Sequence, residues 1–242
     1  MDERYAVVSC HVERPLDDRA WQRFARLQKG RPGGFRIAAL MRPPDEEAGE
    51  DPALWLERAR EAASLGPLGH HTHWGGPGQA RPLGGDPAER VQREGAWLRE
   101  QGLRPTVFCG GGWYLDAEVA GAAAELGYAD CTATAFQPRY LQPGAARLGA
   151  QVPSRLTLPG GGELLELPTT HSLGMLARAL AKGIRAGYVH VYFHDTDLLH
   201  RLRAAAVETS LRVLARRYAR RDLDALVRSG GADLPVNEAF AR

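Results

Sequence analysis

Apolar runs typical of β-strands alternate with helix signals along most of this sequence. Residues 5–10 form the first such run, residues 35–41 form another, and residues 188–193 form the last. Their β-branched and aromatic side chains favour extended backbone. Strands that alternate with helices predict a parallel sheet in an α/β fold, and more than six such units favour closure of the sheet into a barrel.

Aspartate–proline pairs indicate where two of the helices begin. Asp51-Pro52 and Asp86-Pro87 each place a capping carboxylate before a proline at the first helical position. A proline there loses no hydrogen bond, because the first N–H groups of a helix have no partner within it. Further helices are expected over residues 17–29, 117–126, 173–180 and 204–221, and further strands over residues 105–108 and 131–136.

The alternation breaks in a region rich in proline and glycine, residues 137–168. Two strand-like segments, residues 155–158 and 163–167, flank three consecutive glycines and predict a β-hairpin. We interpret this region as an insertion beside the barrel that can wall a substrate cleft.

The composition is compatible with a single domain over residues 1–242. Apolar residues make up 44% of the chain, enough to bury a sizeable core, and the formal net charge of +2 is too small to favour nucleic acid as a partner. The arginine-rich run at residues 212–221 is interpreted as a solvated helix face, with an anionic partner as the alternative. No glycine-rich nucleotide-binding motif follows the first strand, which disfavours an open nucleotide-binding sheet.

The sequence also indicates a compartment. No uncharged apolar window of about 18 residues and no signal peptide is present, so we expect no membrane span and a cytoplasmic protein. The three cysteines, Cys10, Cys109 and Cys131, are odd in number and lie in or near strand-like runs. They are therefore expected to be reduced, mostly buried thiols.

The clearest chemical signal is a pair of histidines, His71 and His73, which share one face of an extended backbone. Neutral imidazole is a common metal ligand, and two imidazoles from one rigid strand cost little entropy to position. His70 points to the opposite face and is left out of the site. The alternative interpretation of this stretch is a solvated, histidine-rich turn.

Two further polar clusters follow strand-like runs. His11 and Glu13 share a face after the first run, and His194 and Asp195 close the last one. On an α/β barrel, catalytic groups collect at the C-terminal rim of the strands, so one shared site is expected there. The alternatives are a partly buried strand histidine at position 11, a surface carboxylate at position 13 and a strand-end turn at residues 194–195.

In this order, the clusters resemble the motifs of the polysaccharide deacetylase (NodB-type) family of carbohydrate esterases. Residues 11–13 stand where the family has an Asp-Asp pair, and residues 71–73 resemble its histidine motif with shortened spacing. Residues 109–116 and 125–128 retain the pattern of the family's third motif but lack the arginine with which that motif begins. Residues 191–195 match the family's last motif, an apolar strand that ends in His-Asp. These motifs occur in the same order as in the family, and together they span most of the chain.

The resemblance implies a distorted (β/α)7 barrel and metal-dependent removal of N-acetyl or O-acetyl groups from sugars. The family's catalytic aspartate and the arginine that orients it are both absent here, where His11 and Cys109 stand. The standard general base is therefore missing from this chain.

The chemistry of amide hydrolysis favours a metal. An amide carbonyl is a poor electrophile, and a bound metal polarises it and lowers the pKa of water from about 15.7 toward about 7. Glu13, His71 and His73 are expected to supply three ligands and leave an open position. The expected cofactor is a divalent metal, zinc in the first place, with cobalt and nickel as alternatives.

Proton transfers need further groups. We assign removal of the water proton to His11 and protonation of the departing amine to His194, oriented by Asp195 or Asp197. If His11 is instead a metal ligand, Asp195 is the next candidate for the base.

Glycines and aromatic residues near these clusters are candidates for substrate binding. Backbone N–H groups of Gly111 and Gly112 can approach a developing oxyanion, although a tight strand-to-helix turn explains these glycines equally well. Trp74, Trp113 and Tyr114 can stack on a sugar face or act as packing residues. The expected substrate is a small or carrier-linked acetylated amino sugar.

Two other functions remain open from the sequence. A metal hydrolase of the phosphoesterase or amidohydrolase type also uses an HxH pair with carboxylates at strand ends. A degenerate deacetylase that only binds a glycan is the non-enzymatic alternative. The sequence leaves the oligomeric state undetermined.

Overall fold

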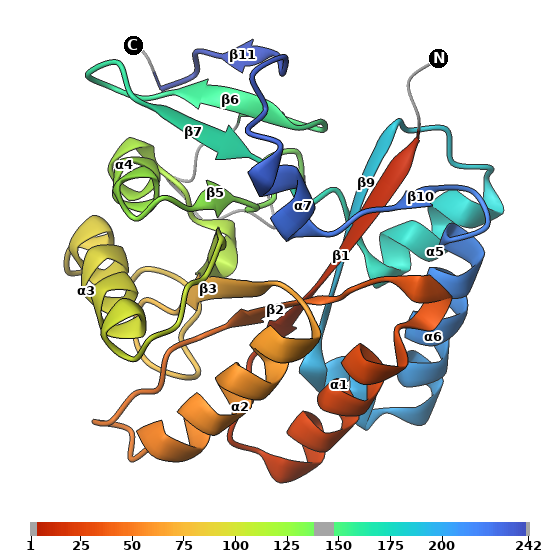
Figure 1. Ribbon diagram of the computed structural model, residues 1–242, viewed down its shortest axis with the longest axis horizontal. Coiled ribbons are helices and arrows are strands. Elements are labelled where there is room, and N and C mark those ends of the chain that lie inside the picture. Colours follow the sequence, from red (N-terminus) through yellow and green to blue (C-terminus); the bar gives the residue numbers. More distant parts are fainter. Residues whose placement is uncertain (1–3, 138–147, 241–242) are drawn as a thin grey trace.

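A single curled sheet forms the centre of the computed structural model, which describes residues 4–137 and 148–240 (Figure 1). The strands are β1 (Tyr5–Val12), β2 (Ala38–Met41), β3 (Leu68–Thr72), β4 (Val107–Gly110), β5 (Ala129–Asp130), β6 (Ser154–Thr157), β7 (Glu163–Glu166), β8 (His171–Ser172), β9 (Tyr188–His194), β10 (Ala219–Arg220) and β11 (Val236–Asn237). Their order in the sheet is β11-β6-β7-β5-β4-β3-β2-β1-β9-β8, and β10 pairs with β1.

Helices lie between the strands and cover the outside of the sheet (Figure 1). They are α1 (Asp18–Gly30), α2 (Pro52–Leu65), α3 (Pro87–Glu100), α4 (Ala117–Glu125), α5 (Leu173–Ala181), α6 (Arg201–Leu214) and α7 (Leu223–Arg228). Short 3-10 helices are η1 (Pro32–Gly34), η2 (Gly111–Trp113) and η4 (Asp195–Leu199). None of the helices in the described ranges is long and apolar enough to cross a membrane.

The strands that carry the predicted site are parallel neighbours. β1 pairs with β2 and β9, and β3 pairs with β2 and β4, all in parallel. The predicted parallel α/β sheet is therefore confirmed. Short β8, β10 and β11 and the antiparallel strand β6 belong to the same sheet, so the described strands do not reduce to seven regular β/α units.

The segment between β7 and β8 runs from one side of the curled sheet to the other. The Leu167 N–H donates to the Asp130 carbonyl at the end of β5 over 2.7 Å. Three residues later, the Thr170 N–H donates to the His190 carbonyl in β9 over 3.0 Å. This segment is therefore hydrogen-bonded to both β5 and β9.

Capping aspartates fix where the helices begin, as the sequence predicts. Asp51 accepts a hydrogen bond from the Ala53 N–H at 2.8 Å, and Asp86 accepts one from the Glu89 N–H at 3.0 Å. Such a cap contributes about 1 kcal/mol to helix stability. Asp17 and Asp116 cap α1 and α4 in the same way.

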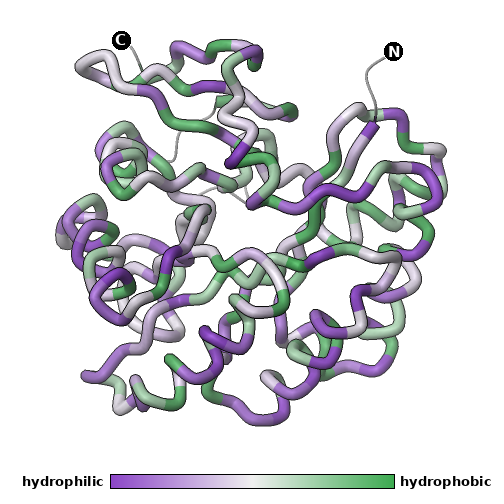
Figure 2. Tube along the Cα trace, viewed as in Figure 1, coloured by the Kyte–Doolittle hydropathy of each residue, from purple (hydrophilic) through white to green (hydrophobic). Residues whose placement is uncertain are grey.

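The core lies on both faces of the strands. Figure 2 shows apolar segments along the central strands and hydrophilic segments on the outward helices. All residues of β2 and β4 are buried, and α1 turns Phe24 and Leu27 toward the sheet. The three cysteines are buried and free, as predicted.

The hairpin prediction is confirmed, but its placement as an insertion beside the barrel is wrong. β6 and β7 pair antiparallel, and β7 then pairs with β5 in parallel. The second half of the hairpin is thus a strand of the main sheet. Part of the predicted insertion, residues 138–147, lies outside the described residues.

Two predicted elements end earlier than expected because tertiary contacts take over. The helix predicted over residues 204–221 stops at Leu214, and Ala219 then pairs with the start of β1, where its N–H donates to the Arg4 carbonyl at 2.9 Å. The strand predicted over residues 131–136 is replaced by the two-residue β5. After it, the Asp130 carboxylate accepts hydrogen bonds from the N–H and hydroxyl of Thr132, which turns the chain.

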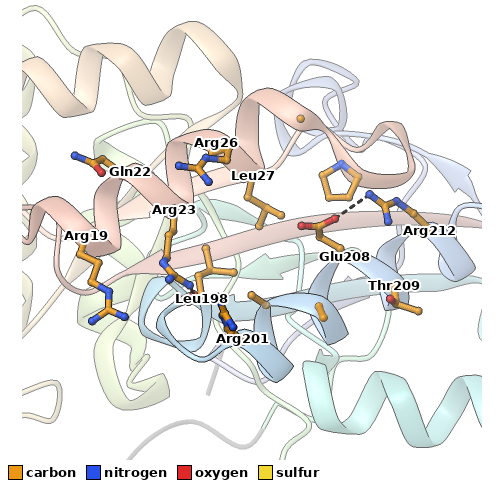
Figure 3. Close-up of a pocket in the computed structure, with 14 residues that line it drawn as sticks. Arg19, Gln22, Arg23, Arg26, Leu27, Leu198, Arg201, Glu208, Thr209 and Arg212 are labelled. Atoms are coloured by element: carbon orange, nitrogen blue, oxygen red, sulfur yellow. Dashed lines mark hydrogen bonds and ion pairs between the residues drawn. The ribbon is translucent and has the colours of Figure 1, made fainter.

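A hollow lies outside the sheet, between α1 and α6 (Figure 3). It has a volume of about 830 Å³ and is lined by none of the residues that the sequence assigned to the site.

Candidate metal centre

Two histidines at the end of β3 point toward one carboxylate. His71 Nε2 lies 3.5 Å from Glu13 Oε1, and His73 Nε2 lies 2.8 Å from Glu13 Oε2. Their other ring nitrogens are occupied, because His71 Nδ1 donates to the Cys109 carbonyl at 2.8 Å and His73 Nδ1 donates to the Pro77 carbonyl at 2.9 Å. A histidine that donates Nδ1–H to a carbonyl presents its Nε2 lone pair, which is the usual arrangement of a metal ligand.

The environment of His73 Nε2 tests whether a metal fits. This nitrogen is buried and makes no hydrogen bond within the described part of the chain, although a carboxylate oxygen lies 2.8 Å away. When Nδ1 carries the proton of the neutral ring, the two facing atoms both present lone pairs, so a cation between them satisfies both. Ligand atoms about 2.0–2.2 Å from a tetrahedral zinc are roughly 3.4 Å apart, close to the spacing of these three side chains.

A proton can also hold the three groups together. Burial alone lowers the pKa of His71, but its hydrogen bonds to Cys109 and Glu13 outweigh this and raise the pKa to about 10. Burial raises the pKa of Glu13, yet the neighbouring rings of His71 and His73 hold it far below its usual range. Without a metal, the site is thus an ion pair, and a metal must displace a proton to bind.

The parallel register explains why these residues meet. His11 lies beside His194 across β1 and β9, and His71 lies beside Cys109 across β3 and β4. Glu13 follows β1 by one residue and shares a face with His11, since side chains alternate along a strand. The predicted rim therefore brings together residues from three strands that are far apart in the sequence.

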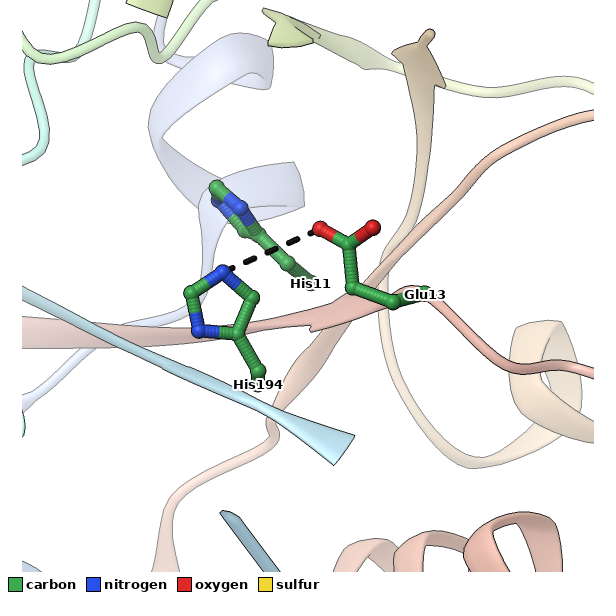
Figure 4. Close-up of side chains that lie close together, drawn as sticks. All are labelled: His11, Glu13 and His194. Carbon is green, nitrogen blue, oxygen red and sulfur yellow. Dashed lines mark ion pairs between the residues drawn. The ribbon is translucent and has the colours of Figure 1, made fainter. Parts of the chain in front are cut away.

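His194 also points toward this carboxylate (Figure 4). Its Nε2 is 3.7 Å from Glu13 Oε1, and its side chain is 37% exposed. Burial of the ring is the largest cause that lowers the pKa of His194, and the nearby His11 is the second; together they bring this pKa to about 4. His194 is therefore neutral near pH 7 in the metal-free chain.

The carboxylate near His194 is Asp197. Asp197 Oδ2 lies 4.0 Å from His194 Nδ1 and accepts a hydrogen bond from the His194 N–H at 3.0 Å, while Arg203 pairs with its other oxygen at 3.0 Å. Of the two carboxylates considered from the sequence, Asp197 is thus the one positioned to orient His194.

Asp195 has a different place from the catalytic one predicted. It is fully buried, and its two oxygens accept hydrogen bonds from the Arg14 N–H at 2.9 Å and the Thr196 N–H at 2.8 Å. Burial raises the pKa of Asp195 to about 6 despite these bonds. The carboxylate ties the end of β9 to the chain after β1.

His11 is enclosed by sulfur and aromatic rings. It is 3% exposed, its Nε2 lies 3.7 Å from Cys109 Sγ, and the rings of Trp113 and Tyr192 each lie 5.1 Å from its ring. Burial raises the pKa of the Cys109 thiol, but a hydrogen bond with Cys131 and the neighbouring His11 together hold it well below its usual value.

Cys109 and Tyr192 are site neighbours that the sequence reasoning missed. Tyr192 precedes His194 by two residues and shares its strand face, a period-2 signal visible in the sequence. Cys109 is placed by its pairing with His71, which no sequence pattern reveals.

Of the aromatic residues predicted to bind substrate, Trp113 lies closest to the histidines. It is half-buried and adopts φ +61°, a rare backbone conformation for a bulky residue that commonly marks a functional site. Tyr114 donates its hydroxyl to Asp116 and packs edge-on against Trp74.

The prediction that Trp74 stacks on substrate is wrong. Its ring is 5% exposed, and its N–H donates to the Gly111 carbonyl at 2.9 Å, so it is a packing residue. Gly111 itself is required by close packing, because a Cβ there would lie 2.4 Å from the Thr72 carbonyl oxygen. Gly112 has φ +63° in the same turn. These contacts favour the tight-turn interpretation of both glycines.

A cleft of about 550 Å³ opens over Glu13 and His73. Arg42 and Glu50 form part of its wall and pair with each other at 2.6 Å. Two of the metal-ligand candidates, Glu13 and His73, thus face an open space large enough for a sugar-sized ligand.

No protein-family model matches the chain, and no curated protein matches it. Among solved structures, the chain is similar to a 4-alpha-glucanotransferase from Thermococcus litoralis, with a TM-score of 0.60 and 10% identity. The match covers 97% of this chain and 40% of that chain, so this chain spans well under half of that protein's length. At this identity the likeness shows the fold alone, a mixed α/β chain around a curled sheet.

Proposed function

We propose that this chain is a metal-dependent hydrolase that removes an acetyl group from an acetylated amino sugar or a related amide. One observation carries the proposal: the Nε2 atoms of His71 and His73 converge on Glu13 while both Nδ1 atoms donate to backbone carbonyls. That arrangement orients both rings for a cation at the head of an open cleft.

The deacetylase assignment rests on the order of the sequence motifs along a curled α/β sheet. A distorted (β/α)7 barrel of the polysaccharide deacetylase type accounts for the strand-end positions of Glu13, His71 and His194. The departures at His11 and Cys109 make this chain a divergent member at most.

Glu13, His71 and His73 would hold a divalent ion, zinc in the first place, with cobalt or nickel as alternatives. When bound, such an ion polarises the amide carbonyl and lowers the pKa of water. The cleft opens over two of these three residues, Glu13 and His73.

His11 and His194 are the groups that move protons. His11 has a ring nitrogen within 4.8 Å of ligand atoms of Glu13 and His194, so it is placed to take a proton from water. His194 is neutral at rest and more exposed than His11, and the two rings lie 5.3 Å apart, so the proton that His11 takes from water passes to His194, which delivers it to the departing amine. Asp197 orients His194 from behind.

The substrate is proposed to be a small or carrier-linked acetylated amino sugar. Trp113, beside His11, offers the ring on which a sugar face can stack. The volume of the cleft is suited to one sugar unit and its attachment.

Acetate release tests this proposal. Zinc-loaded protein is incubated with a panel of small N-acetylated and O-acetylated amino sugars, their nucleotide-linked forms and polymeric glycans. Release from a small or carrier-linked sugar, lost in Glu13→Gln and retained in the matched control His200→Ala, supports it. The exposed His200 makes no side-chain cap hydrogen bond at the start of α6. Release from no compound at all, with a metal bound, contradicts it.

A second candidate is a two-metal hydrolase of the phosphoesterase or amidohydrolase type. The observation that favours it is a second cluster, His11, Glu13 and His194, which shares Glu13 with the first one. A carboxylate shared in this way can bridge two ions about 3.5–4 Å apart. Two ions per chain and turnover of phosphate esters without acetate release would select this candidate.

A further inference from the structure

Arginine side chains gather around the hollow between α1 and α6. Arg19, Arg23 and Arg26 lie on one face of α1, and Arg201 and Arg212 face them from α6 (Figure 3). We call this surface, with these five arginines, the basic groove. The metal centre shares none of its residues.

The positive charge of the basic groove is largely uncompensated. Glu208 is the single carboxylate among its lining residues, and it pairs with Arg212 at 2.8 Å. Arg23 donates to the Leu198 carbonyl, which is neutral. Arg19, Arg26 and Arg201 have no ion-pair partner in the described ranges, so four positive charges converge on one hollow.

The start of α6 adds to this charge. Within the described residues, α1 to α5 and α7 each begin with a side-chain cap, whereas α6 has none and carries no acidic residue in its first turn. Its free N–H groups therefore contribute partial positive charge beside Arg201. Arginines at an uncapped helix N-terminus are unfavourable by the usual rule for helix charge. Asp197 pairs with Arg203 in this turn at 3.0 Å, whereas Arg201 has no ion-pair partner among the described residues.

We propose that the basic groove binds a small phosphorylated molecule through a diphosphate or triphosphate group. Arginine guanidinium groups match phosphate oxygens in bidentate geometry, and several charges over a short distance suit a polyphosphate better than a single carboxylate. The volume of about 830 Å³ is that of a small-molecule site. The formal net charge of +2 leaves little general attraction for a long polyanion. This inference is independent of the proposed hydrolase activity.

Calorimetric titration of the metal-loaded, full-length chain with inorganic pyrophosphate and with ADP tests the inference. Saturable binding of one molecule per chain is expected. The variant Arg19→Gln/Arg26→Gln/Arg201→Gln is expected to weaken it at least about tenfold, since each lost contact is charge-assisted. Arg23 is kept because it supports Leu198.

A matched variant distinguishes binding at the basic groove from an effect of the overall positive charge of the chain. Arg60→Gln/Arg178→Gln/Arg185→Gln removes the same charge from exposed positions outside the groove and is expected to bind both probes as the wild type does. If the groove variant loses its circular dichroism signal, the single change Arg26→Glu replaces it, with the same expected loss of affinity.

Several outcomes overturn the inference. Absence of saturable binding to the wild type does so, and so does equal weakening in both triple variants. Unchanged affinity in the groove variant would place the anion elsewhere, including at the metal centre, which that variant retains. Tighter binding of a 20-base-pair DNA duplex or of anionic phospholipid vesicles, lost in the groove variant, would assign the groove to a polymer or a membrane surface instead.

Discussion

His73 Nε2 lies 2.8 Å from Oε2 of Glu13, yet the two atoms make no hydrogen bond. The opposite side of the same ring is fixed by donation from Nδ1 to the Pro77 carbonyl. An imidazole Nε2 that faces a carboxylate at this distance, while Nδ1 already donates elsewhere, is satisfied when a cation lies between the two atoms. This relationship is the strongest physical argument for a metal centre.

The metal-free chain is expected to lose stability as pH rises. The raised pKa of His71 stabilises the fold fully below the unfolded value of 6.5, and this contribution disappears as pH rises through about 10. The lowered pKa of Glu13 also stabilises the fold, and this contribution is lost only in acid. Thermal unfolding of chelator-treated protein at pH 6 and pH 9 checks this, with a lower Tm expected at pH 9.

Glu13→Gln serves as the control for that pH effect. It removes the charge that raises the pKa of His71, so the fall in Tm between pH 6 and pH 9 should shrink. Zinc should raise the Tm of the wild type more at pH 9 than at pH 6, because binding displaces a proton. A Tm of the metal-free wild type that rises from pH 6 to pH 9 would contradict the ion pair.

Asp195→Ala is expected to affect folding and leave metal binding intact. The substitution leaves the Arg14 and Thr196 N–H groups without the acceptors that the buried carboxylate provides, which costs about 1–3 kcal/mol of unfolding free energy. Urea unfolding measures the loss, and zinc content is measured on the same sample. Unchanged stability with abolished activity would restore Asp195 to the catalytic role predicted from the sequence.

His194→Ala is expected to lower kcat by about 10²–10⁴-fold while the metal content stays at the wild-type value. His194 lies 3.7 Å from Glu13 but belongs to the other cluster, so the ligand set of Glu13, His71 and His73 remains whole. Metal analysis and steady-state kinetics on one preparation distinguish the roles. Loss of metal together with activity would make His194 a ligand.

Trp113→Ala is expected to raise KM for an acetylated sugar more than it lowers kcat. Trp113 packs against His11 and Phe136 and lies outside the ligand set. Kinetics on the variant measure both constants, with Trp74→Phe as a control because Trp74 is buried away from the cleft. A change in kcat alone would assign Trp113 to positioning His11.

Local signals made much of the fold predictable from the sequence. Asp51 and Asp86 cap their helices through hydrogen bonds to residues two or three positions later, so the information lies within one turn. The end of α6 was not predictable, because residues 215–221 continue a helical pattern while Ala219 is drawn into pairing with β1. There the decisive contact comes from the other end of the chain.

The residues of the site also differ in how far the sequence predicts their positions and contacts. Glu13, His71 and His73 are brought together by the general geometry of parallel strands, which the sequence predicts. The roles of Asp195 and Trp74 depend on single contacts, to backbone amides and to the Gly111 carbonyl, that no spacing encodes. Residue type alone therefore could not reveal these contacts.

Metal content per chain is the most direct test of the metal centre. Protein purified without chelators is analysed by mass spectrometry as wild type, Glu13→Ala, His71→Ala and the control His200→Ala. The account predicts near one zinc, cobalt or nickel ion per chain in the wild type and the control, and near none in the other two. A wild type that holds no metal, even after reconstitution, would contradict it and leave the chain as a binding protein.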